Sequence, residues 1–132
     1  MPLRISTTLP PELEAVITRT IGCALAVHKE LGLGYFEGIY RDAMCVELSH
    51  RGLHHRREAA VDVIYRGVPL RGYRVDLLVE EQLIVELKAV EKLLPIHEVQ
   101  VVSYLKATHL KAALLMNFSE EFLRQGLRRI VL

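Results

Sequence analysis

The hydrophobic pattern of the first third of the chain has the period of a helix. Apolar residues recur every three or four positions up to Leu31, and Gly32 and Gly34 then interrupt the pattern. The residues expected to open this helix are Thr7, Thr8, Pro10, Pro11, Glu12 and Glu14. Its predicted core face consists of Leu13, Val16, Ile17, Ile21, Ala24, Leu25 and Val27.

A second helix is predicted from about Phe36 to His50, where Arg51 and Gly52 end the pattern. Five apolar residues of this segment lie near helical spacing, so we expect them to face the core. They are Ile39, Ala43, Cys45, Val46 and Leu48.

The middle of the chain has the alternation that is typical of strands. A first strand is predicted over Ala60–Tyr65, followed by a turn at residues 66–69. Two further strands are predicted over Tyr73–Val79 and Leu83–Lys88. The three polar residues 80–82 between them are expected to form a hairpin loop.

The last part of the chain returns to a helix before ending in strands. Pro95 opens a helix that runs to about Thr108, with Ile96, Val99, Val102 and Leu105 on its apolar face. Ala112–Phe118 is predicted as a strand covered on both faces, residues 119–121 as a short turn and Arg129–Leu132 as an edge strand. The order predicts an α/β fold in which a mixed central β-sheet is flanked by α-helices, as a single domain over residues 1–132.

Composition limits the function without choosing it. With 51% hydrophobic and 25% charged residues, the chain is typical of a globular domain, and its longest uncharged run is too short to cross a membrane. No secretory pattern opens the chain, so we expect a cytoplasmic protein in which Cys23 and Cys45 are buried and reduced. The net charge of +1 argues against binding to nucleic acid through bulk charge. Basic residues do gather locally at Arg51, His54, His55, Arg56 and Arg57, and at Arg124, Arg128 and Arg129.

Charged residues interrupt the apolar pattern of the two middle strands. Because side chains alternate along a strand, Glu86 and Lys88 are expected on one face. If the loop between the strands has three residues, Val79 pairs with Leu83 and Asp76 lies directly opposite Glu86. The two carboxylates are then about 5 Å apart between their Cβ atoms.

Neighbouring carboxylates in a sheet are costly, because they repel each other and lose water. A divalent cation removes this cost, and oxygen ligands suit Mg²⁺ or Mn²⁺. Lys88 is then placed to orient an attacking water or to stabilise charge on a phosphoryl group. The alternative is an ion-pair cluster of Asp76, Glu86 and Lys88 without a function.

Two further groups of residues are candidates for the same site. Glu37 and Tyr40 lie three residues apart, on one helical face beside a glycine turn. On the third predicted helix His97, Gln100 and Tyr104 form a polar stripe, and the last two are positioned to face a ligand. Taken singly, Glu37 is also explained as an acid at a helix start and Tyr104 as a core aromatic.

Together these residues resemble the GxxExxY family of the PD-(D/E)XK nuclease superfamily. The matching motifs are Gly34-x-x-Glu37-x-x-Tyr40, Asp76, Glu86-x-Lys88 and Gln100-x-x-x-Tyr104, and the resemblance extends from about Ile17 to Ile130. Val75 stands where the superfamily name has proline. The resemblance implies a restriction-endonuclease-like core and Mg²⁺-dependent cleavage of phosphodiester bonds.

The resemblance also implies roles for individual residues. It makes Asp76 and Glu86 metal ligands, with the main-chain carbonyl of Leu87 as a third, and Lys88 the residue that positions the nucleophilic water. Glu37 would complete the site by binding metal or by holding the lysine. Gln100 and Tyr104 resemble the QxxxY motif of the RecB-like branch, which helps to position the substrate backbone, and Tyr40 is grouped with these substrate-binding residues.

The resulting hypothesis is a metal-dependent nuclease that acts on DNA in repair, recombination or defence. One alternative is a non-catalytic nucleic-acid-binding or assembly module that retains the fold. Another is metal-dependent chemistry on a different phosphate ester, such as a nucleotide. The strand edges also permit a homodimer.

Overall fold

The computed structural model of the protein describes residues 9–132, so Thr7 and Thr8, predicted to help open the first helix, lie outside the described residues. The helices are α1 (Pro11–Leu31), α2 (Glu37–His50) and α3 (Pro95–Thr108), with a short 3₁₀ helix, η1 (Leu123–Gly126), near the C-terminus. The strands are β1 (His55–Tyr65), β2 (Val68–Val79), β3 (Leu83–Lys88), β4 (Ala112–Asn117) and β5 (Leu127–Val131).

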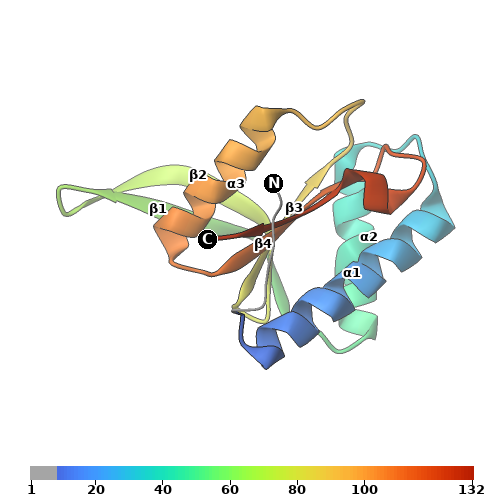
Figure 1. Ribbon diagram of the computed structural model, residues 1–132, viewed down its shortest axis with the longest axis horizontal. Helices are drawn as coiled ribbons and strands as arrows, with labels where there is room; N and C mark the ends of the chain where they lie inside the picture. The colour runs from blue at the N-terminus through green and yellow to red at the C-terminus, as the bar shows by residue number, and fades with distance from the viewer. Residues whose placement is uncertain (1–8) are drawn as a thin grey trace.

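The five strands form one mixed sheet in the order β1-β2-β3-β4-β5. Only β3 and β4 are parallel, and the crossover between them is α3. As Figure 1 shows, α1 and α2 cover one face of the sheet and α3 covers the other. Each layer has its own apolar core, one against α1 and α2 and one against α3. The predicted mixed sheet flanked by helices is confirmed.

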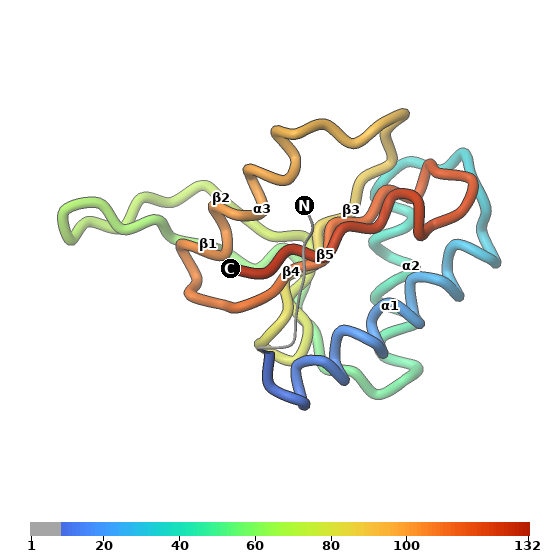
Figure 2. The backbone as a smooth tube through the Cα atoms, viewed as in Figure 1, coloured from blue at the N-terminus to red at the C-terminus, as the bar shows by residue number. Residues whose placement is uncertain are grey.

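The β1–β2 hairpin is longer than the sequence pattern predicts. Its turn consists of Arg66 and Gly67 alone, both with positive φ, so Val68 and Pro69 belong to β2 and not to the turn. The strands of this hairpin extend well past the end of β3, and Figure 2 shows them as an arm that projects from the body of the molecule. The predicted strand over residues 60–65 therefore covers only the outer part of β1.

Several predicted core positions are wrong. Leu25 of α1, Ile39 and Val46 of α2, and Ile96 and Val99 of α3 are exposed. The side of α2 that meets the sheet consists of Tyr40, Met44 and Leu48, and that of α3 of Val101, Tyr104 and Leu105. Apolar residues occur on more than one side of each helix, so hydrophobicity alone could not identify the side that the sheet covers.

The C-terminal elements also differ slightly from the prediction. β4 is buried along its whole length, as predicted, but the short turn expected at residues 119–121 is followed by η1, and the edge strand begins two residues earlier, at Leu127. Cys23 is buried and Cys45 is half-buried, and both are free thiols. Among residues 9–132, no helix is long and apolar enough to cross a membrane.

Candidate metal and phosphodiester site

The candidate site lies where β2 separates from β3. The register of the two strands is the predicted one, with Val79 opposite Leu83, and the last paired residues are Leu77 and Val85. Asp76 and Glu86 are the next residues on each strand. On its other side β2 pairs with β1 on both sides of Asp76, while Glu58 between those pairs has a φ of +47°. The regular hydrogen bonding of the sheet is therefore interrupted at Asp76.

Side chains of the two acids replace the missing main-chain pairs. The main-chain N–H of Asp76 donates to Oε2 of Glu86 at 2.7 Å, and the N–H of Leu87 donates to Oδ2 of Asp76 at 2.8 Å. These reciprocal bonds fix both carboxyl groups at the point where the strands part. Asp76 and Glu86 therefore lie opposite each other, as the register predicts, but they are joined by side-chain to main-chain hydrogen bonds instead of a regular main-chain pair.

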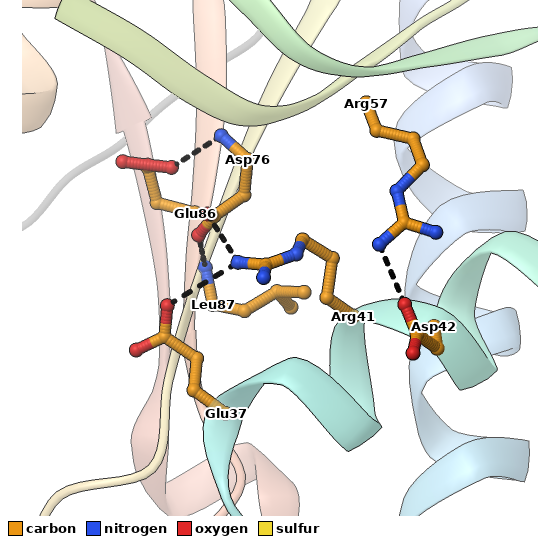
Figure 3. Close-up of polar contacts among 7 residues, drawn as sticks. All are labelled: Glu37, Arg41, Asp42, Arg57, Asp76, Glu86 and Leu87. Atoms are coloured by element: carbon orange, nitrogen blue, oxygen red, sulfur yellow. Dashed lines mark hydrogen bonds and ion pairs between the residues drawn. The ribbon is translucent and has the colours of Figure 1, made fainter.

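Helix α2 contributes a third acid and a cation to the same place. Arg41 lies between two acids, with its Nη1 3.2 Å from Oδ1 of Asp76 and 3.8 Å from Oε2 of Glu37, as Figure 3 shows. The side chains of Arg41 and Asp76 are largely buried, with 22% and 16% of their surface exposed. Glu37 belongs to the first turn of α2 and Arg41 follows it by one helical turn, which is why both reach the same point.

Burial dominates the electrostatics of the acids. Glu86 is 7% exposed, and its burial, together with the neighbouring negative charge of Asp76, raises its pKa to about 8. The pKa of Glu37 is raised by burial and by Asp76, while Lys88 and Arg41 act in the opposite direction. At both acids, burial and the charge of Asp76 therefore outweigh the neighbouring cations.

Lys88 takes no part in an ion-pair cluster. In the described part of the chain no acidic group lies within 4.0 Å of its ammonium group, and the cation that contacts Asp76 is Arg41. Lys88 is the last residue of β3, with a half-buried side chain, and its main-chain carbonyl accepts a hydrogen bond from Phe118. The alternative of an ion-pair cluster of Asp76, Glu86 and Lys88 does not fit this arrangement.

Tyr40 fixes the turn that leads into α2. Its side chain is fully buried, its hydroxyl donates to the carbonyl of Gly32 at 2.6 Å, and it stacks on Phe118 with the ring centres 4.7 Å apart. The ring of Tyr35 packs edge-on against the ring of Tyr40. These contacts place Tyr40 in the core, so it positions the start of α2 and Glu37 instead of reaching a substrate.

On the opposite face, α3 brings one of its predicted residues close to the acids. Tyr104 is buried edge-on against Tyr73, and its pKa is raised by burial and then by the nearby charge of Glu86. Gln100, one turn earlier, is exposed. His97 is half-buried, and its Nδ1 accepts a hydrogen bond from the N–H of Leu94 at the start of α3, which accounts for it as a capping residue.

The donor set of this site fits a hard divalent cation. Asp76 and Glu86 supply carboxylate oxygens, which Mg²⁺ and Mn²⁺ prefer, and no ion pair among residues 9–132 neutralises Glu86. Across the same residues, no three side chains of His, Cys, Asp or Glu are grouped so that they could hold a metal ion. Mg²⁺ is commonly bound by one or two carboxylates together with water and substrate phosphate, so a pair is sufficient.

Sequence reasoning missed two residues at this site. Arg41 was overlooked because a basic residue in an exposed-looking helical position carries no pattern of its own, although its place four residues after Glu37 was a usable signal. Asn117, at the end of β4, is fully buried, and its side-chain amide bonds both the N–H and the carbonyl of Val90. This pair of bonds holds the loop that follows Lys88.

A match to a known protein family covers most of the chain. A family model described as the PD-(D/E)XK nuclease superfamily matches residues 14–130, which include every candidate residue of the site. No curated protein and no solved structure matches the chain.

Proposed function

The chain belongs to the PD-(D/E)XK nuclease superfamily, and from the site that it carries we propose that it is a metal-dependent nuclease that hydrolyses phosphodiester bonds in DNA. The observation that carries this proposal is the convergence of Asp76 and Glu86 at the separation of β2 and β3. Lys88 follows Glu86 by two residues on the same strand.

Each residue has a role that follows from its chemistry. Asp76 and Glu86, with the main-chain carbonyl of Leu87, would hold Mg²⁺ or Mn²⁺. When bound, such an ion neutralises phosphate charge and lowers the pKa of a bound water. Among residues 9–132 no acid lies within 4.0 Å of the ammonium group of Lys88, so this group is available to hold the attacking water or the phosphate oxygen.

The two flanking helices orient these groups and the substrate. Glu37 sits at the start of α2 beside Arg41, and its partly buried carboxylate would complete the site or hold the lysine. On α3, the exposed amide of Gln100 is positioned to contact the substrate backbone, and Tyr104 packs behind the acids. Tyr40 supports this arrangement from the core.

The finer assignment is part of the same proposal. We assign the chain to the GxxExxY family and to the RecB-like branch on the motifs around Glu37, Glu86 and Gln100. The substrate is nucleic acid, and the open edges of β1 and β5 permit two copies to associate for cuts in a duplex. We also propose that the protein acts in the cytoplasm, in repair, recombination or defence.

A cleavage assay with matched variants tests this function. End-labelled single- and double-stranded DNA is incubated with Mg²⁺ or Mn²⁺ and with the wild type, Asp76→Asn or Lys88→Met. We expect both variants to lose cleavage by roughly 10²-fold or more. Asp62→Asn and Lys92→Met, which change the same residue types outside the site, should leave the cleavage rate unchanged.

The outcomes separate the candidate functions. Wild-type protein that cleaves no polymer, while Asp76→Asn still binds DNA without metal, would overturn the nuclease and favour a nucleic-acid-binding module. Hydrolysis of mononucleotides without hydrolysis of polymers would instead point to a different phosphate ester as substrate.

A further inference from the structure

The contact between Arg41 and Asp76 has an unusual construction for a structural ion pair. Only Nη1 of Arg41 approaches the acids, at 3.2 Å from Asp76 and 3.8 Å from Glu37. Its Nε is buried and, among the described residues, has no hydrogen-bond partner. A guanidinium offers five donors in a fixed fork, so this pair uses little of its capacity.

Two arginines of β1 make closer pairs than Arg41 does. Arg56 holds both carboxylate oxygens of Glu81, at 2.8 and 3.1 Å. Arg57 donates to Asp42, the residue that follows Arg41 on α2, at 2.5 Å and outside the site, as Figure 3 shows. The pairs Arg71–Asp62 at 3.7 Å and Arg128–Glu98 at 3.9 Å are longer still, but their side chains are exposed, whereas Arg41 and Asp76 are largely buried.

Arg41 also lies close enough to the candidate metal ligands to repel a bound metal ion. It contacts an oxygen of Asp76, the acid whose other oxygen is held by the N–H of Leu87. A divalent cation that used Asp76 and Glu86 would face the guanidinium charge at short range, in a largely buried place where repulsion is weakly screened. Arg41 and the metal ion thus compete for the same carboxylate.

We propose that Arg41 is an internal counter-ion of the site, which holds Asp76 in the metal-free protein and gives way when a divalent cation binds to Asp76 and Glu86. It is a positioning residue, because it acts through Asp76. Its Nη1, 3.2 Å from Oδ1 of Asp76, orients that carboxylate. This inference rests on the metal dependence of the proposed function.

Competition predicts that removing Arg41 strengthens metal binding. Mn²⁺ alone is titrated into wild type, Arg41→Gln, Arg41→Lys and Arg57→Gln by calorimetry. Arg41→Gln should bind Mn²⁺ at least about tenfold more tightly than the wild type, which corresponds to about 1.4 kcal/mol. Arg41→Lys, which keeps the charge, should stay near the wild type. Arg57→Gln removes the closer ion pair between β1 and Asp42 of α2, and it should leave the affinity for Mn²⁺ unchanged.

Thermal unfolding supplies a second measurement that a purely structural arginine would not alter in this way. Arg41→Gln should melt below the wild type in EDTA, because Asp76 and Glu37 then lack their counter-ion, and the difference should narrow in saturating Mn²⁺. For Arg57→Gln the difference from the wild type should be the same with and without Mn²⁺.

The results distinguish this inference from the proposed function. Wild type that binds Mn²⁺, with Arg41→Gln binding it no more tightly, overturns the role of Arg41 and leaves the metal site intact. If neither protein binds Mn²⁺, the metal dependence itself fails and the inference fails with it. Binding by Arg41→Gln alone supports the counter-ion role in its strongest form.

Discussion

Substitution of Glu86 by glutamine should make the metal-free protein more stable. The wild-type carboxyl is buried beside Asp76, and its pKa is raised to about 8. Glutamine has nearly the same shape, its carbonyl oxygen still accepts the N–H of Asp76, and its amide can donate to the Asp76 carboxylate. Glu86→Gln therefore removes the cost of the buried acid while keeping its hydrogen bond.

The size and pH dependence of this gain in stability follow from the pKa of Glu86 in the folded and in the unfolded protein. Below the ordinary value of 4.5 the carboxyl is protonated in both states, so Glu86 has little effect. Between 4.5 and about 8 the unfolded chain releases the proton while the native protein retains it, so wild-type stability falls as the pH rises. At 1.36 kcal/mol per pH unit the ceiling is roughly 5 kcal/mol, and relaxation of the site makes about 1–3 kcal/mol the expected gain at pH 8.

Urea unfolding in EDTA, followed by circular dichroism, measures this gain directly. The free energy of unfolding of wild type and Glu86→Gln is compared at pH 5, 6.5 and 8, so that the titration of all other groups cancels in the difference. Glu121→Gln, on an exposed position before η1, is the matched control and should differ from the wild type by less than about 0.5 kcal/mol. The gain of Glu86→Gln should be small at pH 5 and largest at pH 8.

Two results would refute this reasoning. A variant that is less stable than the wild type at pH 8 would mean that the charged carboxylate is already compensated in the metal-free protein. A gain of equal size at pH 5 and pH 8 would mean that packing, and not the proton, accounts for it.

Three further predictions concern the frame around the site. Tyr40→Phe removes the buried hydroxyl bond to the turn before α2 and should lower the free energy of unfolding by about 1–2 kcal/mol in urea; no change would mean that the stacked ring alone fixes the turn. Gly126→Ala should lower the free energy of unfolding by about 1–3 kcal/mol, because the added Cβ would come within 2.8 Å of the Asn117 main-chain oxygen. In α2, Gly38→Ala meets nothing closer than 3.7 Å and should raise the free energy of unfolding by up to about 1 kcal/mol. Equal effects of the two substitutions in urea unfolding would contradict this reasoning. Asn117→Ala frees both main-chain groups of Val90, so hydrogen exchange should accelerate in residues 89–94 and not in α1.

Much of the fold could be predicted, because local signals and the final packing agree. The hairpin loop at residues 80–82 set the register of β2 and β3, and this register alone placed Asp76 opposite Glu86. The run of apolar residues in β4 likewise predicted a strand buried on both faces. In such segments a register shift would expose the whole apolar side, so the sequence admits few alternatives.

The remainder depended on contacts between distant segments. The choice of Tyr40, Met44 and Leu48 as the buried side of α2 is made by the sheet, which no local pattern of the helix describes. Arg41 meets Asp76 across 35 positions of the chain, and its partner becomes visible only when α2 packs beside β2. The interruption of the sheet at Asp76 likewise coincides with a positive φ at Glu58 on the neighbouring strand, which no local pattern indicates.

A crystal structure of the protein soaked in Mn²⁺, with the ion located by its anomalous scattering, tests the central claim most directly. The account predicts an anomalous peak within coordination distance of the Asp76 and Glu86 carboxylates, about 2.0–2.6 Å, and Arg41 turned away from Asp76. A map without a peak between these carboxylates, with Arg41 still against Asp76 in crystals that bind Mn²⁺ elsewhere, would contradict it.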